Sequence, residues 1–275
     1  MKAGFPGWGP ASFAVVRQLV VSLPLVAIVA TLVLFFWVVT KAAREYVLRR
    51  RDVGAREALA DQAGSLVTAV AATFAFFVGF AISASWGAVT AAQLAVEQQA
   101  TALHQMDWEL DNIADPAQSA ALKAKLVAYA SAVVGEDAGV LKRGDNTPMP
   151  SAGALDSFEN DLRAYAFGPA VPEREAGTLV AAASALSSSS AAVAAVANRA
   201  LPGPLLTLLI VVGVLASILM GISTVSYDRP SLSFIWCLIP AMSIATVLAL
   251  AYPFAVRSGV TLAPMQAVAE QLAAK

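Results

Sequence analysis

The residue types that most often carry chemistry are scarce in this chain of 275 residues. His104 is the only histidine and Cys237 is the only cysteine, and the two lie far apart in the sequence. A structural zinc site needs several such ligands, and a disulfide framework needs pairs of cysteines, so neither is expected. The sequence also lacks a glycine-rich phosphate loop, a nucleophile elbow and a metal-binding helix motif. We therefore expect no catalytic residue, no cofactor and no metal site, and we do not expect an enzyme.

Two groups of ionisable residues deserve separate consideration as polar sites. Asp107, Glu109 and Asp111 alternate at i, i+2, which on a helix spreads the carboxylates apart, so they predict a solvated face. Glu97 and His104 are seven residues apart and therefore share one helix face. Their spacing favours a local polar contact over a ligand site.

The composition assigns the chain to the integral membrane proteins. Hydrophobic residues make up 58% and charged residues 13%, whereas an ordinary soluble domain has about 25% charged residues. The net charge of −1 argues against a disordered chain and against a nucleic-acid partner. Four stretches without Asp, Glu, Lys or Arg are long enough to cross a bilayer, namely 18–40, 62–96, 200–227 and 230–256.

We expect an all-α membrane protein with a helical extramembrane domain, 90–203, inserted between the second and third of four transmembrane helices. The transmembrane helices are predicted at 19–40, 66–89, 205–226 and 232–254. The other segments are an N-terminal tail (1–18), a basic connector (41–65), a short turn (227–231) and a C-terminal tail with a short helix (255–275).

Helical periodicity also predicts the interior of the inserted domain. Apolar residues recur at helical spacing in four segments, near 90–114, 116–135, 153–167 and 173–199. Asp115-Pro116 is typical of a helix start. No helix breaker lies between the second transmembrane segment and Ile113, so a single helix from about 66 to 113 is expected.

Lysine and arginine residues near the membrane segments predict the orientation. The segment 41–61 holds six of them, and Arg229 makes seven on that side, against four in the two terminal tails. The positive-inside rule then places 41–61 in the cytoplasm. Both termini and the domain 90–203 are predicted to be extracytoplasmic, in the inner membrane of a bacterial-type cell. Between Glu97 and Arg199 there are 13 acidic and 7 basic residues, a net charge of −6.

Small residues recur at every fourth position of the predicted membrane helices. The candidate helix-packing residues are Ala75, Gly79, Ser83, Gly87, Gly213, Ser217 and Gly221. Such ridges let helix backbones approach closely in lipid, which serves either packing within the bundle or a subunit interface around a pore. None of the four segments contains Asp, Glu, Lys, Arg or His, which argues against an ion-coupled transporter.

Phe76 and Phe80 are the candidate pore-lining residues. They are four residues apart and share a helix face, which we expect to differ from the face of the small residues. A ring of such side chains can gate conduction by excluding water. The alternative is that both side chains face lipid or fill the core.

Several stretches, in this order and spacing, resemble the bacterial bestrophin-like domain family of four-span membrane proteins. They are FVGFAISASW (77–86), EQQATAL (97–103), LVAY (126–129), NRALP (198–202) and YPF (252–254). The resemblance covers roughly residues 45–272. The chain departs from the family at two places. Glu136-Asp137 stands where Glu-Trp is usual, and Ala251-Tyr252 stands where an acidic residue precedes the Pro-Phe pair.

The resemblance implies a chloride-channel-like role, because true bestrophins form pentameric anion channels. It also implies that the segment between the second and third spans is cytosolic, which is opposite to the orientation that the charge count predicts. Two functions remain open. One is an oligomeric anion channel with lipid and further copies of the chain as partners. The other is a non-conducting membrane sensor or docking protein whose protein partner is unknown.

Overall fold

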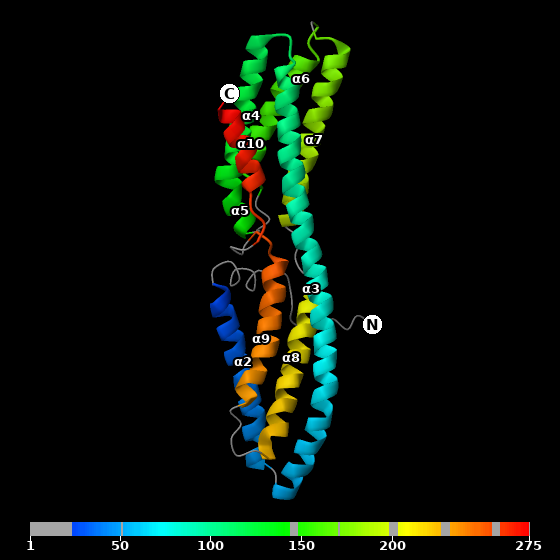
Figure 1. Ribbon diagram of the computed structural model, residues 1–275, viewed down its shortest axis with the longest axis vertical. Coiled ribbons are helices and arrows are strands. Elements are labelled where there is room, and N and C mark those ends of the chain that lie inside the picture. Colours follow the sequence, from blue (N-terminus) through cyan, green and yellow to red (C-terminus); the bar gives the residue numbers. More distant parts are fainter. Residues whose placement is uncertain are drawn as a thin grey trace, which may run out of the picture. The chain divides into compact units, whose positions relative to one another are not determined.

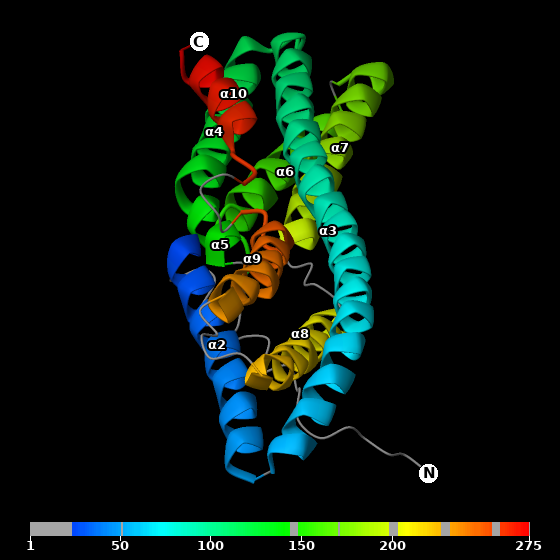
Figure 2. The same ribbon diagram turned by 60° about the horizontal axis from the view of Figure 1, so that its bottom comes forward.

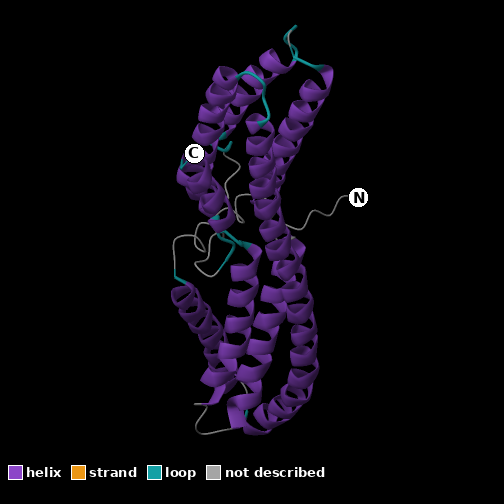
Figure 3. Ribbon diagram, turned by 45° about the horizontal axis from the view of Figure 1, so that its top comes forward, coloured by secondary structure: helices purple, strands orange, loops and turns teal. Residues whose placement is uncertain are grey.

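The computed structural model describes residues 24–50, 52–143, 148–169, 171–197, 203–226, 232–254 and 259–274. These residues form helices joined by short loops, without a strand among them (Figure 3). The elements are α2 (Leu25–Arg50), α3 (Val53–Asp111), α4 (Pro116–Ala132), the π-helix η1 (Val133–Asp137), α5 (Ala138–Arg143), α6 (Ala152–Ala166), α7 (Glu173–Ala197), α8 (Gly203–Ser223), the 3-10 helix η2 (Thr224–Ser226), α9 (Leu232–Ala251) and α10 (Ala263–Ala273). The prediction of an all-helical protein is confirmed.

The chain divides into two compact units. The first unit comprises Met1–Gly87 and Ala200–Ala251, and the second comprises Ala88–Arg199 and Tyr252–Lys275. α3 contributes to both units, because it is one unbroken helix of 59 residues. The predicted tail 1–18, the start of the predicted helix 19–40 and the predicted turn 227–231 lie outside the described residues.

In the first unit, α2 packs against both α8 and α9 (Figures 1 and 2). Gly213 of α8 faces the buried ring of Phe36, and a Cβ atom at this glycine would lie 3.2 Å from that ring. Gly221 lies eight residues further along α8, where a Cβ atom would overlap the backbone oxygen of Thr40. Glycine is therefore required at Gly221, since the backbones of α2 and α8 approach too closely for any side chain.

Polar contacts at the same end of α2 join it to the neighbouring elements. The Thr40 Oγ1 atom lies 3.7 Å from the Sγ atom of Cys237 in α9, and both groups are buried. The Nε atom of Arg44 donates to the backbone oxygen of Thr224 in η2, at 3.4 Å. The ammonium of Lys41 lies 4.9 Å from the centroid of the Trp37 ring, within the range of a cation–π contact.

The predicted basic connector 41–65 is almost entirely helical. α2 continues to Arg50, and α3 begins at Val53. The Arg56 guanidinium donates to the backbone oxygen of Leu48 at 2.6 Å and satisfies one of the free carbonyls at the end of α2. Arginine near the last turn of a helix is also favoured by the helix dipole.

Five helices in the described part of the chain are long and apolar enough to cross a membrane, namely α2, α3, α7, α8 and α9. The fifth, α7, falls in the predicted extramembrane domain. Its buried stripe, which includes Leu179 and Leu186, belongs to the core of the second unit. Its first turn carries Glu173 and Glu175.

The second unit has a core of its own, built from α4, α6, α7, α10 and the second part of α3. Tyr129, Phe158, Leu103, Met106 and Leu186 are fully buried in it. These helices begin close to where the sequence predicts them. Asp115 caps α4 as expected, since its carboxylate accepts from the backbone N–H of Ala117 at 2.9 Å and Pro116 is the first helical residue.

The close approach at Gly221 gives a direct stability test. Gly221→Ala should lower the unfolding temperature in detergent, because the new methyl group forces two backbones apart at a cost of about 1–3 kcal/mol. Gly213→Ala should cost less, since the ring of Phe36 can shift. Gly64→Ala is the control, because a Cβ atom there meets nothing within 4 Å. Equal unfolding temperatures for the Gly221 and Gly64 variants would contradict the packing argument.

Candidate functional site

The part of α3 that belongs to the first unit has one buried face and one exposed face. Phe74, Val78, Ala81 and Ser85 form the buried face, with exposed fractions of 0–8%. They recur at helical spacing of three and four residues, which places them on one side of the helix. A Cβ atom at Gly213 of α8 would lie 3.5 Å from the ring of Phe74, so this face is turned toward α8.

Both candidate pore-lining residues lie on the opposite, exposed face. Phe76 is 69% exposed and Phe80 is 60% exposed. The alternative that they fill the core of this chain is therefore excluded. The ring of Phe76 also contacts the ring of Phe77 edge to face, with the centroids 5.6 Å apart, which restricts its freedom on the surface.

The small residues of α3 share this exposed side with the two phenylalanines. Ala75, Gly79, Ser83 and Gly87 are all exposed. Our expectation of two different faces is wrong, because a repeat of four residues drifts around a helix with 3.6 residues per turn. Ser83 therefore lies on the same side of the helix as Phe76, because the two residues are seven positions apart.

Open space lies where a side chain would begin at the glycines of α3. A Cβ atom at Gly79 or at Gly87 would meet nothing within 4 Å, in contrast to Gly213 and Gly221 of α8. Ser217 lies between the two α8 glycines, fully buried, and its hydroxyl donates to the backbone oxygen of Gly213 at 2.9 Å. The small residues of α8 thus lie inside the unit, whereas those of α3 are exposed on its surface.

This exposed side of α3 is uncharged. The sequence contains no ionisable residue from Gln62 to Val96, a stretch that extends beyond the first unit. A helix face of phenyl rings and small side chains can pack against lipid or against identical helices. It can also exclude water from a narrow passage, but it offers no group for acid–base, nucleophilic or metal chemistry.

The carboxylates that the sequence predicts on a solvated face of α3 behave differently from one another. Asp107 is 5% exposed, so for this residue the prediction is wrong. Asp107 directly follows the fully buried Met106 and lies on the buried side of the helix with it. The i, i+2 spacing of the three carboxylates does not show which of them is turned toward the core. Asp111 forms an ion pair with Lys123 of α4, and Glu109 is half-buried.

Glu97 and His104 line the same shallow groove on the second unit, together with Trp108. Both side chains are exposed. Pro264 and Val268 of α10 form the other wall of the groove. The two polar residues therefore share a face as expected, and the groove is a surface feature of the second unit.

Polar groups buried in the second unit have shifted pKa values. Gln99 donates to the phenol oxygen of Tyr129 at 2.8 Å, and burial raises the pKa of Tyr129. Burial also raises the pKa of Asp137, although the hydrogen bonds from Ser151 oppose this effect. Burial and the hydrogen bond to Glu175 raise the pKa of Tyr165 to about 12. These groups therefore remain protonated over a wider pH range than usual.

The long apolar helices define the class of this protein as a helical membrane protein. A family model described as the bestrophin-like domain matches residues 26–261. The chain belongs to the bestrophin-like family. No curated protein matches this sequence.

Solved structures with the same fold come from a bacterial bestrophin homolog of Klebsiella pneumoniae. A point-mutant form is 15% identical, with a TM-score of 0.67 over 89% of this chain and 97% of that chain. The structure solved by Zn-SAD phasing is also 15% identical, with a TM-score of 0.62 over 90% and 97%. A further structure, described as a membrane protein, has a TM-score of 0.62 at 15% identity over 90% and 97%. At this level of identity the likeness concerns the fold alone.

Gly79 is exposed and Phe74 is buried, so replacing each of them with leucine should have different effects. Gly79→Leu should weaken association between copies of the chain and leave the fold of each copy intact, because a Cβ atom at position 79 meets nothing within 4 Å in the described part of the chain. Phe74→Leu should lower the unfolding temperature without changing association, since Phe74 is buried within the chain. Light scattering in detergent and thermal unfolding measure the two properties.

Gly64→Leu is the matched control, because Gly64 is also exposed on α3 but lies outside the ridge of small residues. It should change neither property. If Gly79→Leu and Gly64→Leu assemble alike, the exposed ridge is not an interface.

Proposed function

We propose that this protein is an oligomeric anion channel of the bacterial inner membrane, with the exposed side of α3 turned toward the pore. Its membership of the bestrophin-like family supports the proposal, since the characterised members of that family are anion channels. The observation that carries the assignment to α3 is the exposure of Phe76 and Phe80 on an uncharged helix face.

Two properties of this face support the proposed placement of α3 around a pore. Exposed phenyl rings at successive turns form an apolar ring when several copies are arranged around an axis, and such a ring is an ion gate when water leaves it. The small residues between the rings let neighbouring α3 helices approach closely enough to narrow the passage. Chloride is the expected permeant ion, because the family resemblance implies it.

Four spans, α2, the first part of α3, α8 and α9, are the arrangement that we propose for the membrane. α7 is apolar enough to be a fifth candidate, but its buried stripe contributes to the core of the second unit and its first turn is acidic. A glutamate within the hydrocarbon would be costly. The second unit is then the extramembrane domain.

A second candidate function is a non-conducting sensor or docking protein. The continuity of α3 favours it, since one helix from Val53 to Asp111 belongs to both units and could transmit a displacement between them. In this case the phenylalanines would contact lipid, and no current would be observed.

Anion flux into liposomes tests the proposal directly. Purified wild-type protein should conduct chloride, and Phe80→Ala should raise the flux severalfold, because a smaller side chain widens and hydrates the apolar constriction. Phe234→Ala on α9 is the matched control, since Phe234 is also an exposed phenylalanine, 48% exposed, on an apolar helix.

The control variant should conduct like the wild type. Flux that is unchanged in Phe80→Ala would remove α3 from the pore. The absence of flux from every variant, with the proteins correctly folded and reconstituted, would favour the docking function.

We also propose that the junction of α2 and α3 is cytoplasmic and that the second unit is extracytoplasmic. Six Lys and Arg residues in 41–61 support this orientation. In a Cys237→Ser background, an impermeant maleimide should label Asp156→Cys but not Glu57→Cys in spheroplasts. Both positions are exposed and lie in the described part of the chain.

Permeabilised spheroplasts are the control, in which both cysteines should react. The reverse pattern in intact spheroplasts, with Glu57→Cys labelled and Asp156→Cys protected, would show the orientation that the resemblance to true bestrophins implies.

A further inference from the structure

The helix path of the second unit contains a π-turn, in which Val133 and Asp137 are buried. η1 follows α4 directly and leads into α5 without a break. The buried carboxylate of Asp137 accepts from the backbone N–H of Ser151 at 2.9 Å and also from the Ser151 hydroxyl. This contact fixes the π-turn against the start of α6. Single π-turns inside helices are rare and occur frequently at functional sites.

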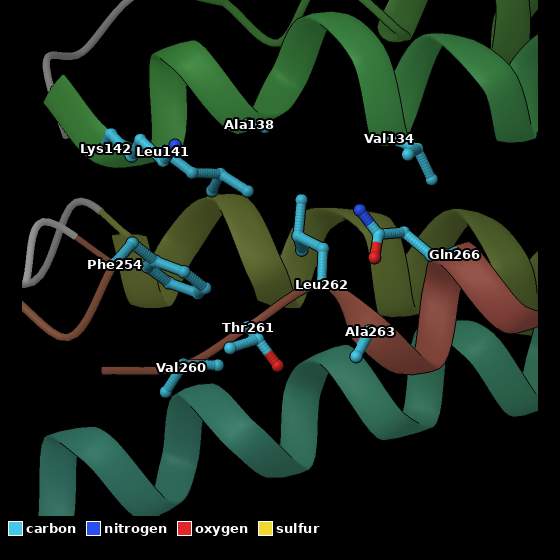
Figure 4. Close-up of a pocket in the computed structure, with 10 residues that line it drawn as sticks. All are labelled: Val134, Ala138, Leu141, Lys142, Phe254, Val260, Thr261, Leu262, Ala263 and Gln266. Atoms are coloured by element: carbon cyan, nitrogen blue, oxygen red, sulfur yellow. The ribbon is translucent and has the colours of Figure 1, made fainter. Parts of the chain in front are cut away.

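A cavity of about 420 Å³ lies beside this π-turn, entirely within the second unit. Figure 4 shows Val134 and Leu141 along one wall, and Leu262, Thr261 and Gln266 along the other. The first wall comes from η1 and α5, and the second comes from the segment before α10 and from the start of α10 itself. Its volume lies within the range of about 300–1,000 Å³ that is typical of small-ligand pockets.

The lining of the cavity combines an apolar body with one positive charge. Val134, Leu141, Phe254 and Leu262 supply apolar surface. Lys142 is the single ionisable side chain among the lining residues. No ion pair within the described part of the chain involves Lys142. The hydroxyl of Thr261 and the amide of Gln266 add neutral hydrogen-bonding groups.

A positive charge at the edge of an apolar cavity selects for an anion with an apolar body. The lining contains no carboxylate, so a cationic ligand would find no counter-charge there. We propose that this cavity binds an aliphatic carboxylate, with the carboxylate at Lys142 and the chain between Leu141 and Leu262. The ligand is either a water-soluble short-chain acid or a fatty acid from the bilayer.

Octanoate binding to the full-length protein in nanodiscs tests this site. We expect saturable binding in equilibrium dialysis, with a Kd of roughly 0.1–1 mM for an anion of this size. Lys142→Met should weaken it about tenfold, because it removes a charge-assisted hydrogen bond and keeps the length of the side chain. Lys142→Arg should restore binding, and Ala138→Phe should abolish it by filling the cavity.

Lys125→Met is the matched control. It removes the same charge from the same unit, but Lys125 pairs with Asp161 away from the cavity. Its affinity for octanoate should equal that of the wild type, and each variant should show the wild-type elution profile and unfolding temperature. The neutral analogue 1-octanol should bind the wild type and Lys142→Met alike.

Comparing fatty acids of different chain length distinguishes the two sources of the ligand. Binding of octanoate without palmitate identifies a water-soluble acid, whereas affinity that rises from octanoate to palmitate identifies a membrane fatty acid. Either result supports the site. Equal octanoate affinity in wild type and Lys142→Met, or no saturable binding at millimolar octanoate, overturns it.

Discussion

The backbone approach of α8 to α2 at Gly221 is the constraint on which the first unit depends. In lipid the hydrophobic effect gives no net drive between helices, so association relies on close packing and on a few polar contacts. Here the absent side chain of Gly221 lets the Thr40 carbonyl reach α8, and the ring of Phe36 fills the space beside Gly213. The hydroxyl of Thr40 in turn contacts Cys237, so α9 is fixed at the same level of α2.

This packing determines which side of α3 is left exposed. Since α2 already contacts both α8 and α9, α3 contributes one stripe, through Phe74 and its neighbours, to the interior of the unit. The other side keeps a ridge of small residues and two phenyl rings, all of them exposed. In a soluble protein such a face would cause aggregation. In a membrane it is a surface for lipid or for identical helices, which is compatible with the pore that we propose.

Much of the helical architecture could be predicted from the sequence, because the physical signals are local. Charge-free stretches and the Asp115-Pro116 start depend on neighbouring residues alone. Asp107 shows the limit of prediction from such local signals. Its burial depends on the exact rotation of α3 against other helices, and no local pattern contains that rotation. The rotation of the α3 ridge onto the side of Phe76 was predictable in principle, since it follows from 3.6 residues per turn.

The π-turn could not have been predicted in the same way. VVGED at 133–137 has no breaker except Gly135, and it continues the helical periodicity of α4. What fixes the extra residue is a tertiary contact, the hydrogen bond from the backbone of Ser151 to the buried carboxylate of Asp137. The cavity beside the π-turn is lined in part by the segment after α9, which lies more than a hundred residues later in the chain.

The uncharged face of α3 also constrains how an anion could be selected. The family tends to have an acidic residue before its Pro-Phe pair, but this chain has Ala251-Tyr252 there. With no fixed charge from Gln62 to Val96, the pore that we propose cannot select by a ring of charged side chains. Selection would then depend on the cost of dehydration at the phenyl constriction. Large, weakly hydrated anions lose their water more cheaply than small ones, so the same constriction that blocks water would favour them over strongly hydrated anions.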